Sequence, residues 1–482
     1  MNVFDENAEK ELRAKHGLAA YCNSKGTVTS INPMFFAALF YVTNKLVYEQ
    51  AERRFYFYNP NTGEWEKKEN TLILNQIWRM VFEYSKQFNH ECLESKCPVN
   101  ILRNIMLHLS VFATEKDFFA SNKQKFIHCN NDFLVYDKEA KKWAQVPFSA
   151  DFHSRNRSNI IYDPVATCPQ FITKLILSAM SEDDAKLLQL YVGQCLLGRN
   201  LSQKFLMLTG TANGGKSTLV NVIEALIGLY NRTELRLEHM SGRFELQRLV
   251  GKTLLTAKDV KSNFLNTGGA YKLKSLVGND MLTTESKGVN DTADILGGFN
   301  AIITCNNNLR VSIDGDHDAW KRRMLWIKYD NPPPDEVIVD FDQKLLAEES
   351  SGILNWALEG AAELLSNGGK IPRSAKQDDR INNFMQESDS VNAFVSECVE
   401  RMPDSAVTVS ELLVAYSHYC QDRTWQPLPE REFQTRLPDI MLKIFNAARR
   451  NDVDRDGKAQ RGYAGFIITT PAASQITIPT AA

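Results

Sequence analysis

The chain has 482 residues, which is long enough to bury about three domain-sized cores. Its composition, with 43% hydrophobic and 24% charged residues and no low-complexity tract, excludes a wholly disordered or fibrous protein. The 56 Lys and Arg nearly balance the 58 Asp and Glu, so contact with nucleic acid has to come from local basic features and not from a global positive field.

The spacing of the cysteines and the N-terminal residues indicate the cellular compartment of the protein. The cysteines are odd in number and lack a repeated Cys-x-x-Cys spacing, which is typical of reduced thiols in a cytosol. His90, Cys92 and Cys97 lie close together, but no second cluster stands at the distance that a zinc site uses, so ordinary thiols are favoured. The N-terminus lacks a signal-peptide pattern and no stretch reaches the ~18 apolar residues that span a bilayer. We therefore expect a cytoplasmic protein without a membrane partner.

Residues 1–190 mix helical and strand signals and predict an N-terminal α/β module. In two segments, 55–65 and 133–143, an aromatic run leads into a turn and ends at a tryptophan, as in a β-hairpin. Segments 71–88 and 169–198 place apolar residues at helical spacing. We expect the aromatic side chains here to form a core more often than to stack on nucleic-acid bases.

A short apolar strand, predicted at 205–209, begins a different pattern. It runs directly into a glycine-rich turn and then into a helical pattern at 217–227. Further apolar, strand-like runs follow between helical or loop segments; they are 253–257, 299–304 and 324–327. Alternation of this kind predicts a parallel α/β sheet.

The C-terminal part has a helical character. Segment 341–366 is predicted to be helical, and Pro372 interrupts the pattern. Residues 386–468 predict a compact unit of helices that ends in a basic turn and a final strand. The residues from Thr470 onward are typical of a disordered tail.

The glycine-rich turn fits G-x-x-x-x-G-K-[ST], the phosphate-binding loop. Its glycines let backbone N–H groups point inward around phosphates, and the next helix adds the positive end of its dipole. Lys216 is expected to reach the β- and γ-phosphates, and the Ser217 hydroxyl to join the Mg²⁺ shell. ATP with Mg²⁺ is therefore the predicted cofactor. The predicted nucleotide-binding residues are Gly210, Thr211, Ala212, Asn213, Gly214, Gly215, Lys216, Ser217 and Thr218.

Three later segments carry residues suited to act on a bound nucleotide. A strand-like run leads to Asp259, where a carboxylate would organise Mg²⁺, although surface acids after strands are common. A second run leads to Asn306, whose amide would orient water or sense the γ-phosphate; an Asn-rich turn explains it equally well. Arg322 and Arg323 would supply an arginine finger to a neighbouring subunit, whereas an isolated Arg pair is otherwise typical of a solvated turn.

The order of these segments resembles the superfamily 3 helicases, specifically the phage-plasmid and poxvirus primase-helicase branch. The segments are FLMLTGTANGGKST, LLTAKDV, LKSLVGNDMLTTESKG, IITCNNN and DAWKRRMLWIKYD. Flanking segments at 163–171, 188–193 and 347–360 are also similar to that branch, and the resemblance covers residues 130–470. Such an order is far more specific than any single motif.

The resemblance assigns catalytic roles. Lys216 matches the lysine of the nucleotide loop, Asp259 the acid of the second motif and Asn306 the sensor asparagine. Arg322 or Arg323 matches the finger. The family often has two acids in its second motif, whereas Lys258 precedes the acid here, which leaves the identity of the catalytic carboxylate open. An extra Lys321 before the arginines leaves the choice between them open as well.

The resemblance also implies DNA contacts. Lys274 and Lys287 lie in the segment that resembles the one leading into the pore hairpin that grips single-stranded DNA, with Lys287 near the tip. The final unit resembles a winged-helix domain whose wing would bring Arg449 and Arg450 to phosphates; a solvated hairpin is nearly as good an explanation.

Taken with the resemblance, the sequence predicts an α/β fold, an AAA+-like P-loop ATPase core with an N-terminal α/β module and a C-terminal winged-helix domain. The expected divisions are 1–190 for the module, 191–332 for the core, 333–385 for a helical lid or linker, 386–470 for the winged helix and 471–482 for the tail.

The function implied is that of an ATP-dependent DNA helicase of a phage, plasmid or mobile element, which translocates on single-stranded or forked DNA as a ring, a hexamer, during replication. Residues 1–190 contain no Asp-x-Asp pair for a polymerase site, so any primase or polymerase is expected to be a separate partner. An ATP-switched origin-binding or loading protein without processive unwinding is the alternative. A P-loop metabolite kinase would leave 270–330 and 386–468 unexplained.

Overall fold

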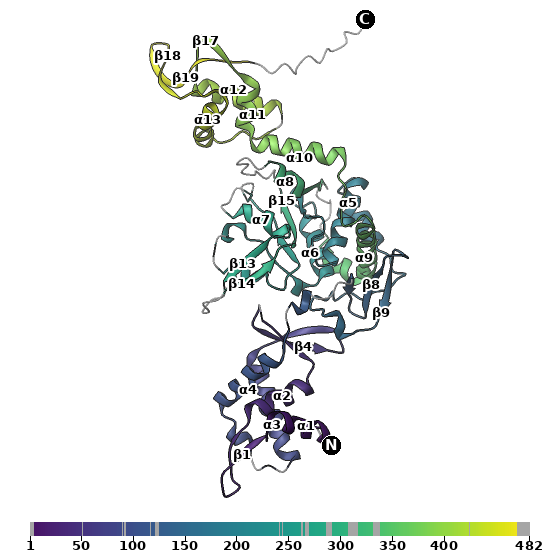
Figure 1. Cartoon of the computed structure of the whole chain (residues 1–482). Coiled ribbons are helices and arrows are strands. Elements are labelled where there is room, and N and C mark those ends of the chain that lie inside the picture. Colours follow the sequence, from purple (N-terminus) through teal and green to yellow (C-terminus); the bar gives the residue numbers. More distant parts are fainter. Residues whose placement is uncertain are drawn as a thin grey trace.

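The computed structural model describes residues 4–50, 52–88, 90, 93–115, 117–120, 125–240, 242, 244–261, 264–265, 269–285, 292–306, 317–330, 338–423 and 425–469. Figure 1 shows an elongated molecule in which an N-terminal unit, a central α/β unit and a C-terminal unit follow one another. The predicted mixed α/β fold is confirmed. None of the described helices is long and apolar enough to cross a bilayer.

The N-terminal unit packs four helices around an aromatic core that includes Phe35, Phe36 and Tyr84. The hairpin predicted at 55–65 is confirmed as the antiparallel pair β4–β5. Its helices are α1 (Glu6–His16), α2 (Pro33–Thr43), α3 (Asn70–Gln87) and α4 (Val99–Phe112), with the short 3-10 helices η1 (Leu93–Lys96) and η2 (Phe118–Ala120). Its strands are β1 (Ala20–Cys22) and β2 (Val28–Ile31), and the four-stranded sheet of β5 (Glu64–Lys68), β4 (Arg54–Asn59), β3 (Leu46–Glu49) and β6 (Thr114–Glu115).

Much of residues 125–196 belongs to the core of the central unit, whereas Ala150 packs in a smaller cluster with Trp65 of the N-terminal sheet. The second predicted hairpin is confirmed as the pair β8–β9. Its Trp143 indole donates a hydrogen bond to the carbonyl of Leu358, 2.9 Å away, and residues 127–195 share one hydrophobic cluster with residues 206–371. The predicted boundary at residue 190 runs through this shared core, while the full set of domain divisions stays a prediction. The elements are β7 (Phe126–His128), β8 (Phe133–Asp137), β9 (Lys142–Val146), η3 (Ala150–Phe152), a π-helical turn η4 (Phe171–Ile176) and α5 (Glu182–Leu196).

The central sheet has five parallel strands in the order β11-β12-β15-β10-β16. Four of them are the predicted strands, whereas β11 was not expected. Alternate residues of β10 enter two different cores: Leu206 and Leu208 face α5, α6 and α9, and Met207 faces the side that holds α7 and α10. Burial on both faces explains why these strands are continuously apolar. The strands are β10 (Phe205–Thr209), β11 (Arg232–Glu234), β12 (Leu254–Ala257), β15 (Asn300–Cys305) and β16 (Met324–Lys328).

Helices cover both faces of this sheet (Figure 1). Pro372 lies between α9 and α10, as the predicted interruption requires. The helices are α6 (Lys216–Ile227), α7 (Ala270–Val277), α8 (His317–Arg323), α9 (Phe341–Ser366) and α10 (Ala375–Ser388), with 3-10 turns η5 (Leu229–Asn231), η6 (Leu237–His239) and η7 (Leu246–Leu249). The hairpin of β13 (Met281–Glu285) and β14 (Thr292–Leu296) projects from this unit.

The C-terminal unit has its own core around Phe394, Tyr416 and Phe433. Its helix α12 begins with a capping box in which Thr408 and Glu411 satisfy each other's backbone N–H groups. The predicted basic turn and final strand are confirmed as the hairpin β18–β19, while the long strand β17 was not expected. The elements are α11 (Ser390–Cys398), β17 (Val399–Thr408), α12 (Val409–Asp422), α13 (Glu430–Phe445), β18 (Arg450–Arg455) and β19 (Lys458–Ile468). The predicted tail lies outside the described residues.

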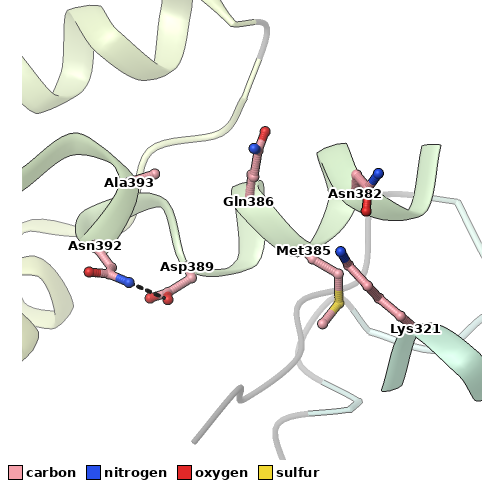
Figure 2. Close-up of a pocket in the computed structure, with 7 residues that line it drawn as sticks. All are labelled: Lys321, Asn382, Met385, Gln386, Asp389, Asn392 and Ala393. Atoms are coloured by element: carbon pink, nitrogen blue, oxygen red, sulfur yellow. Dashed lines mark hydrogen bonds between the residues drawn. The ribbon is translucent and has the colours of Figure 1, made fainter. Parts of the chain in front are cut away.

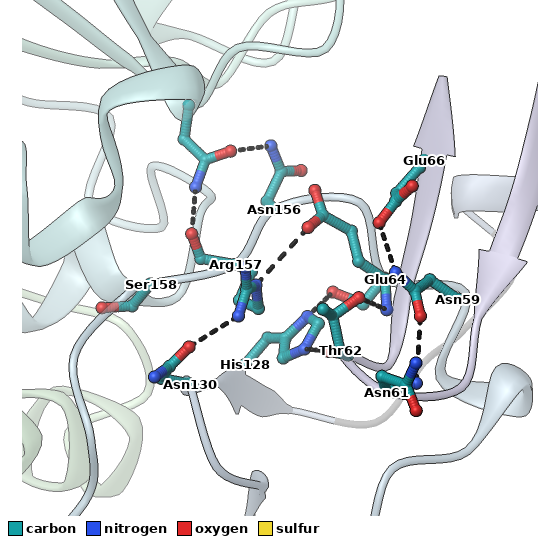
Figure 3. Close-up of polar contacts among 12 residues, drawn as sticks. Asn59, Asn61, Thr62, Glu64, Glu66, His128, Asn130, Asn156, Arg157 and Ser158 are labelled. Atoms are coloured by element: carbon teal, nitrogen blue, oxygen red, sulfur yellow. Dashed lines mark hydrogen bonds and ion pairs between the residues drawn. The ribbon is translucent and has the colours of Figure 1, made fainter. Parts of the chain in front are cut away.

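A polar strap at residues 154–158 joins the N-terminal unit to the central unit (Figure 3). Arg157 lies 3.4 Å from Glu64 of β5 and donates a 2.6 Å hydrogen bond to Asn130. On the other side, Asn156 donates to Asn231 at the far end of the turn that follows α6. The strap thus contacts both units through side chains that the sequence places far apart.

Candidate nucleotide-binding site

The glycine-rich loop connects β10 to α6 at the carboxyl edge of the parallel sheet. A Cβ on Gly210 would lie 1.8 Å from the carbonyl oxygen of Tyr329, so only glycine fits against the residue that follows β16. Gly215 has φ +96°, a left-handed conformation that L side chains rarely adopt. Both glycines of the motif are therefore required by the backbone geometry, independently of any ligand.

Lys216 begins helix α6 and is almost wholly buried, with 3% of its surface exposed. Its Nζ donates hydrogen bonds to the carbonyls of Gly210 and Thr211, at 3.1 and 2.6 Å. Burial lowers the pKa of this ammonium, while the Asp259 carboxylate acts in the opposite direction. A lysine charge is thus concentrated inside the loop, beside the positive end of α6.

Ser217 and Asp259 meet beside this loop. The Ser217 hydroxyl donates a hydrogen bond to Asp259 Oδ2 at 3.1 Å. The Asp259 backbone N–H donates to Thr304 Oγ1 of the adjacent strand β15 at 2.9 Å, which fixes the aspartate at φ +50°. Asn306 directly follows β15 and is exposed, so the structure brings it to the same edge of the sheet. A hydroxyl, a carboxylate and an amide gathered here are oxygen ligands of the kind that Mg²⁺ takes.

Lys258 turns away from the loop. Its Nζ donates to Asn221 Oδ1 at 2.6 Å and to Glu224 Oε2 at 2.8 Å, both on the helix α6. Glu224 is 3% exposed and also accepts a hydrogen bond from Thr256. Lys258, which stands directly before Asp259, therefore forms an ion pair with a buried glutamate. Sequence reasoning missed Glu224, although a lysine at the end of a buried strand signals the need for a counter-charge.

The two candidate arginines differ in their surroundings. Arg323 is 8% exposed, and its Nε donates to the carbonyl of Lys274 at the end of α7, 3.1 Å away. Arg322 is exposed. Both residues precede β16, whose first residue Met324 pairs in register with Phe205, the first residue of β10. They therefore lie at the amino edge of the sheet, a strand length of ~17 Å from the loop of the same chain.

Lys321 points toward α10 (Figure 2). It lines a shallow pocket with side chains of α10 and α11 that include Asn382, Met385 and Asn392. The extra lysine of the arginine motif thus faces a neighbouring helix of its own chain, which separates it from the exposed Arg322.

The proposed DNA-contacting residues are dispersed. Lys274 lies on α7 with its ammonium 5.5 Å from the centre of the Trp320 ring, and Lys287 lies outside the described residues. Arg449 and Arg450 are exposed at the start of the β18–β19 hairpin, and Arg450 forms a 2.6 Å ion pair with Asp452. Part of the positive charge of this hairpin is therefore neutralised locally.

Comparisons with known proteins divide the chain into two matched segments. Residues 208–323 match a protein family of unknown function (DUF5906), and this segment holds the loop, Asp259, Asn306 and both arginines. Residues 386–467, the C-terminal unit, are similar to a family described as Poxvirus D5 protein-like.

The solved structures that are similar to this chain include the apo structure of the NrS-1 C terminal region (305-718). It has 11% sequence identity and a TM-score of 0.47, and the match covers 90% of this chain and 99% of that one. A second structure, the A form of the same region, has a TM-score of 0.45 at 11% identity, with the same coverage of each chain. No curated protein shows significant similarity to the chain. The C-terminal unit is thus similar to the poxvirus D5 proteins.

Proposed function

We propose that the chain is an ATP-dependent DNA helicase of a phage, plasmid or mobile element, built on an AAA+-like core and acting as a hexameric ring during replication. The observation that supports this proposal is that the residues suited to bind a nucleotide and the candidate arginine finger lie at opposite edges of one sheet. The loop with its Ser217–Asp259 pair lies at one edge, and the exposed Arg322 lies at the other.

The loop side supplies the residues for nucleotide binding. Backbone N–H groups between Gly210 and Gly215 would surround the phosphates, and Lys216 would exchange its two carbonyl contacts for phosphate oxygens. Ser217 and Asp259 would hold Mg²⁺, with Asn306 orienting the attacking water. ATP and Mg²⁺ remain the proposed cofactors.

Arg322 would need a neighbouring subunit in order to act on a nucleotide. An arginine ~17 Å from its own loop serves that loop poorly, whereas in a ring it would reach the nucleotide of the next subunit. Because Arg323 is buried against α7, we assign the finger to Arg322. The active site would then be complete only between two subunits.

DNA contact is assigned to two regions. The hairpin β13–β14, together with Lys274 of α7 and Lys287, would face the pore. The C-terminal unit, proposed as a winged helix, would add Arg449 and Arg450. Its order of helix, strand, helix, helix and hairpin, together with the similarity to poxvirus D5 proteins, supports a role in replication. A separate primase or polymerase would be the partner.

The test is strand separation on a forked DNA with a single-stranded tail. Wild-type protein should separate the strands only with hydrolysable ATP, Lys216→Ala should not, and Lys376→Ala, at an exposed lysine of α10, should behave like the wild type. Mixing Lys216→Ala with Arg322→Ala should restore hydrolysis above the sum of the two. DNA-dependent hydrolysis without strand separation would instead favour an ATP-switched loading protein.

A further inference from the structure

Two cations from distant parts of the chain hold the last carbonyls of helix α8. Lys204 Nζ donates to the carbonyl of Arg322 at 2.7 Å, and Arg373 Nη1 donates to the carbonyl of Lys321 at 2.6 Å. Lys204 directly precedes β10, and Arg373 precedes α10. The final carbonyls of a helix lack partners within it and carry partial negative charge, so two cations here satisfy and neutralise them.

Burying the Lys204 ammonium costs free energy, so its contact with the Arg322 carbonyl is unlike an incidental surface contact. Lys204 is 9% exposed, and burial lowers its pKa to about 8, with the nearby Arg373 adding to the effect. Asp378 acts in the opposite direction and forms a 3.2 Å ion pair with Arg373. A buried lysine that only filled space would be replaced at a lower cost by an apolar side chain.

We propose that Lys204 and Arg373 are positioning residues for Arg322, an inference that rests on the proposed function. Their bonds fix the backbone of the turn from which the exposed Arg322 side chain leaves, and so aim it at the neighbouring subunit's nucleotide. Transition-state stabilisation by an arginine depends strongly on geometry, and a displacement of about 1 Å costs ~100-fold in rate.

The clamp, as we call the pair of Lys204 and Arg373 on the carbonyls of α8, is also connected to the nucleotide loop through strand β10. Lys204 adjoins the first residue of β10, and the nucleotide loop begins directly after its last residue, Thr209. One strand of ~17 Å therefore joins the loop of a subunit to the finger that the same subunit offers to its neighbour. Weakening the clamp should act on the neighbour's hydrolysis and leave the subunit's own nucleotide binding intact.

The test uses Lys204→Met and Arg373→Met, which remove the charge and keep an unbranched side chain, with Lys376→Met as the exposed control. We expect kcat to fall ~10- to 100-fold for each clamp variant, with KM within about twofold of the wild type. Arg373→Lys, which keeps a cation at the carbonyl, should recover part of the loss. The control should match the wild type.

Subunit mixing separates positioning from simple misfolding. Lys204→Met mixed with Lys216→Ala should regain activity, because an intact loop then meets a well-placed finger, whereas Lys204→Met mixed with Arg322→Ala should not. Wild-type kcat in Lys204→Met, or no recovery with Lys216→Ala, would overturn the proposal. Failure of the reference mixture of Lys216→Ala and Arg322→Ala would instead refute the shared active site of the proposed function.

Discussion

Ser217 and Asp259 are 42 residues apart in the sequence, yet the hydroxyl of one donates a 3.1 Å hydrogen bond to the carboxylate of the other. We expect Asp259→Asn to reduce ATP hydrolysis by ~100-fold, because the amide loses the charge that a Mg²⁺ site needs while it keeps the size of the side chain. Phosphate release at increasing Mg²⁺ concentration measures the effect. Asp280→Asn, at an exposed aspartate, is the control; a wild-type rate in Asp259→Asn would remove Asp259 from the site.

The two arginines should respond differently to truncation. Arg322→Ala should lower hydrolysis by ~10³-fold with little change in melting temperature, because the residue is exposed. Arg323→Ala should lower the free energy of unfolding by about 1–3 kcal/mol, because a buried side chain and its hydrogen bonds to the carbonyls of Lys274 and Ala319 are removed. Thermal melting and hydrolysis assays on both variants check this. The assignment of the finger is wrong if Arg323→Ala is stable and inactive while Arg322→Ala is active.

Two glycines set the contact between α5 and α9. A Cβ on Gly193 would lie 2.2 Å from the backbone nitrogen of Ala361, and one on Gly360 would lie 2.1 Å from the carbonyl of Gln189. Gly193→Ala should therefore cost about 2–3 kcal/mol of unfolding free energy, because the two backbones must separate. Gly368→Ala, where nothing lies within 4 Å and φ is +66°, should cost about 1 kcal/mol. Equal denaturation midpoints for the two variants would contradict the close packing.

His128 should make the protein sensitive to acid. Its ring lies 2.8 Å from Ser154 Oγ and 2.7 Å from the carbonyl of Thr62, and burial lowers its pKa from 6.5 to about 4. Above pH 6.5 both folded and unfolded states hold a neutral ring. Between pH 6.5 and about 4 the unfolded state binds the extra proton, so stability falls with pH by up to about 3 kcal/mol.

The measurement is urea denaturation of the wild type and of His128→Gln from pH 7.5 to 4.5. The glutamine variant should lose less stability on acidification, while the exposed His239→Gln should follow the wild type. Parallel pH profiles for His128→Gln and the wild type would show that another group controls the acid response.

Local sequence patterns predicted the elements whose partners are adjacent in the chain. The apolar run of β10, the turn glycines and the helix after Lys216 form one continuous segment, so spacing alone determined their order. The β18–β19 hairpin was predicted for the same reason. The aromatic runs that lead into a turn and end at a tryptophan likewise predicted the hairpins β4–β5 and β8–β9.

Local sequence patterns could not predict the contacts between residues that are distant in the chain. Trp143 of β9 bonds to Leu358, 215 residues later, and this contact draws the second hairpin into the central core. Arg323 and Arg322 are equivalent in sequence and differ only because the end of α7 covers one of them. The Lys258–Glu224 ion pair also depends on a helix packing against a strand, which side-chain chemistry can suggest but spacing cannot specify.

The most direct test of the account is phosphate release from ATP by the purified protein, with and without single-stranded DNA. The Lys216 ammonium is hydrogen-bonded to two carbonyls of the loop, and its replacement would remove the proposed phosphate contact while leaving the strands of the sheet in place. We predict DNA-stimulated turnover by the wild type, and turnover at background by Lys216→Ala with an unchanged melting temperature. Turnover by Lys216→Ala equal to that of the wild type would contradict the assignment of the nucleotide site.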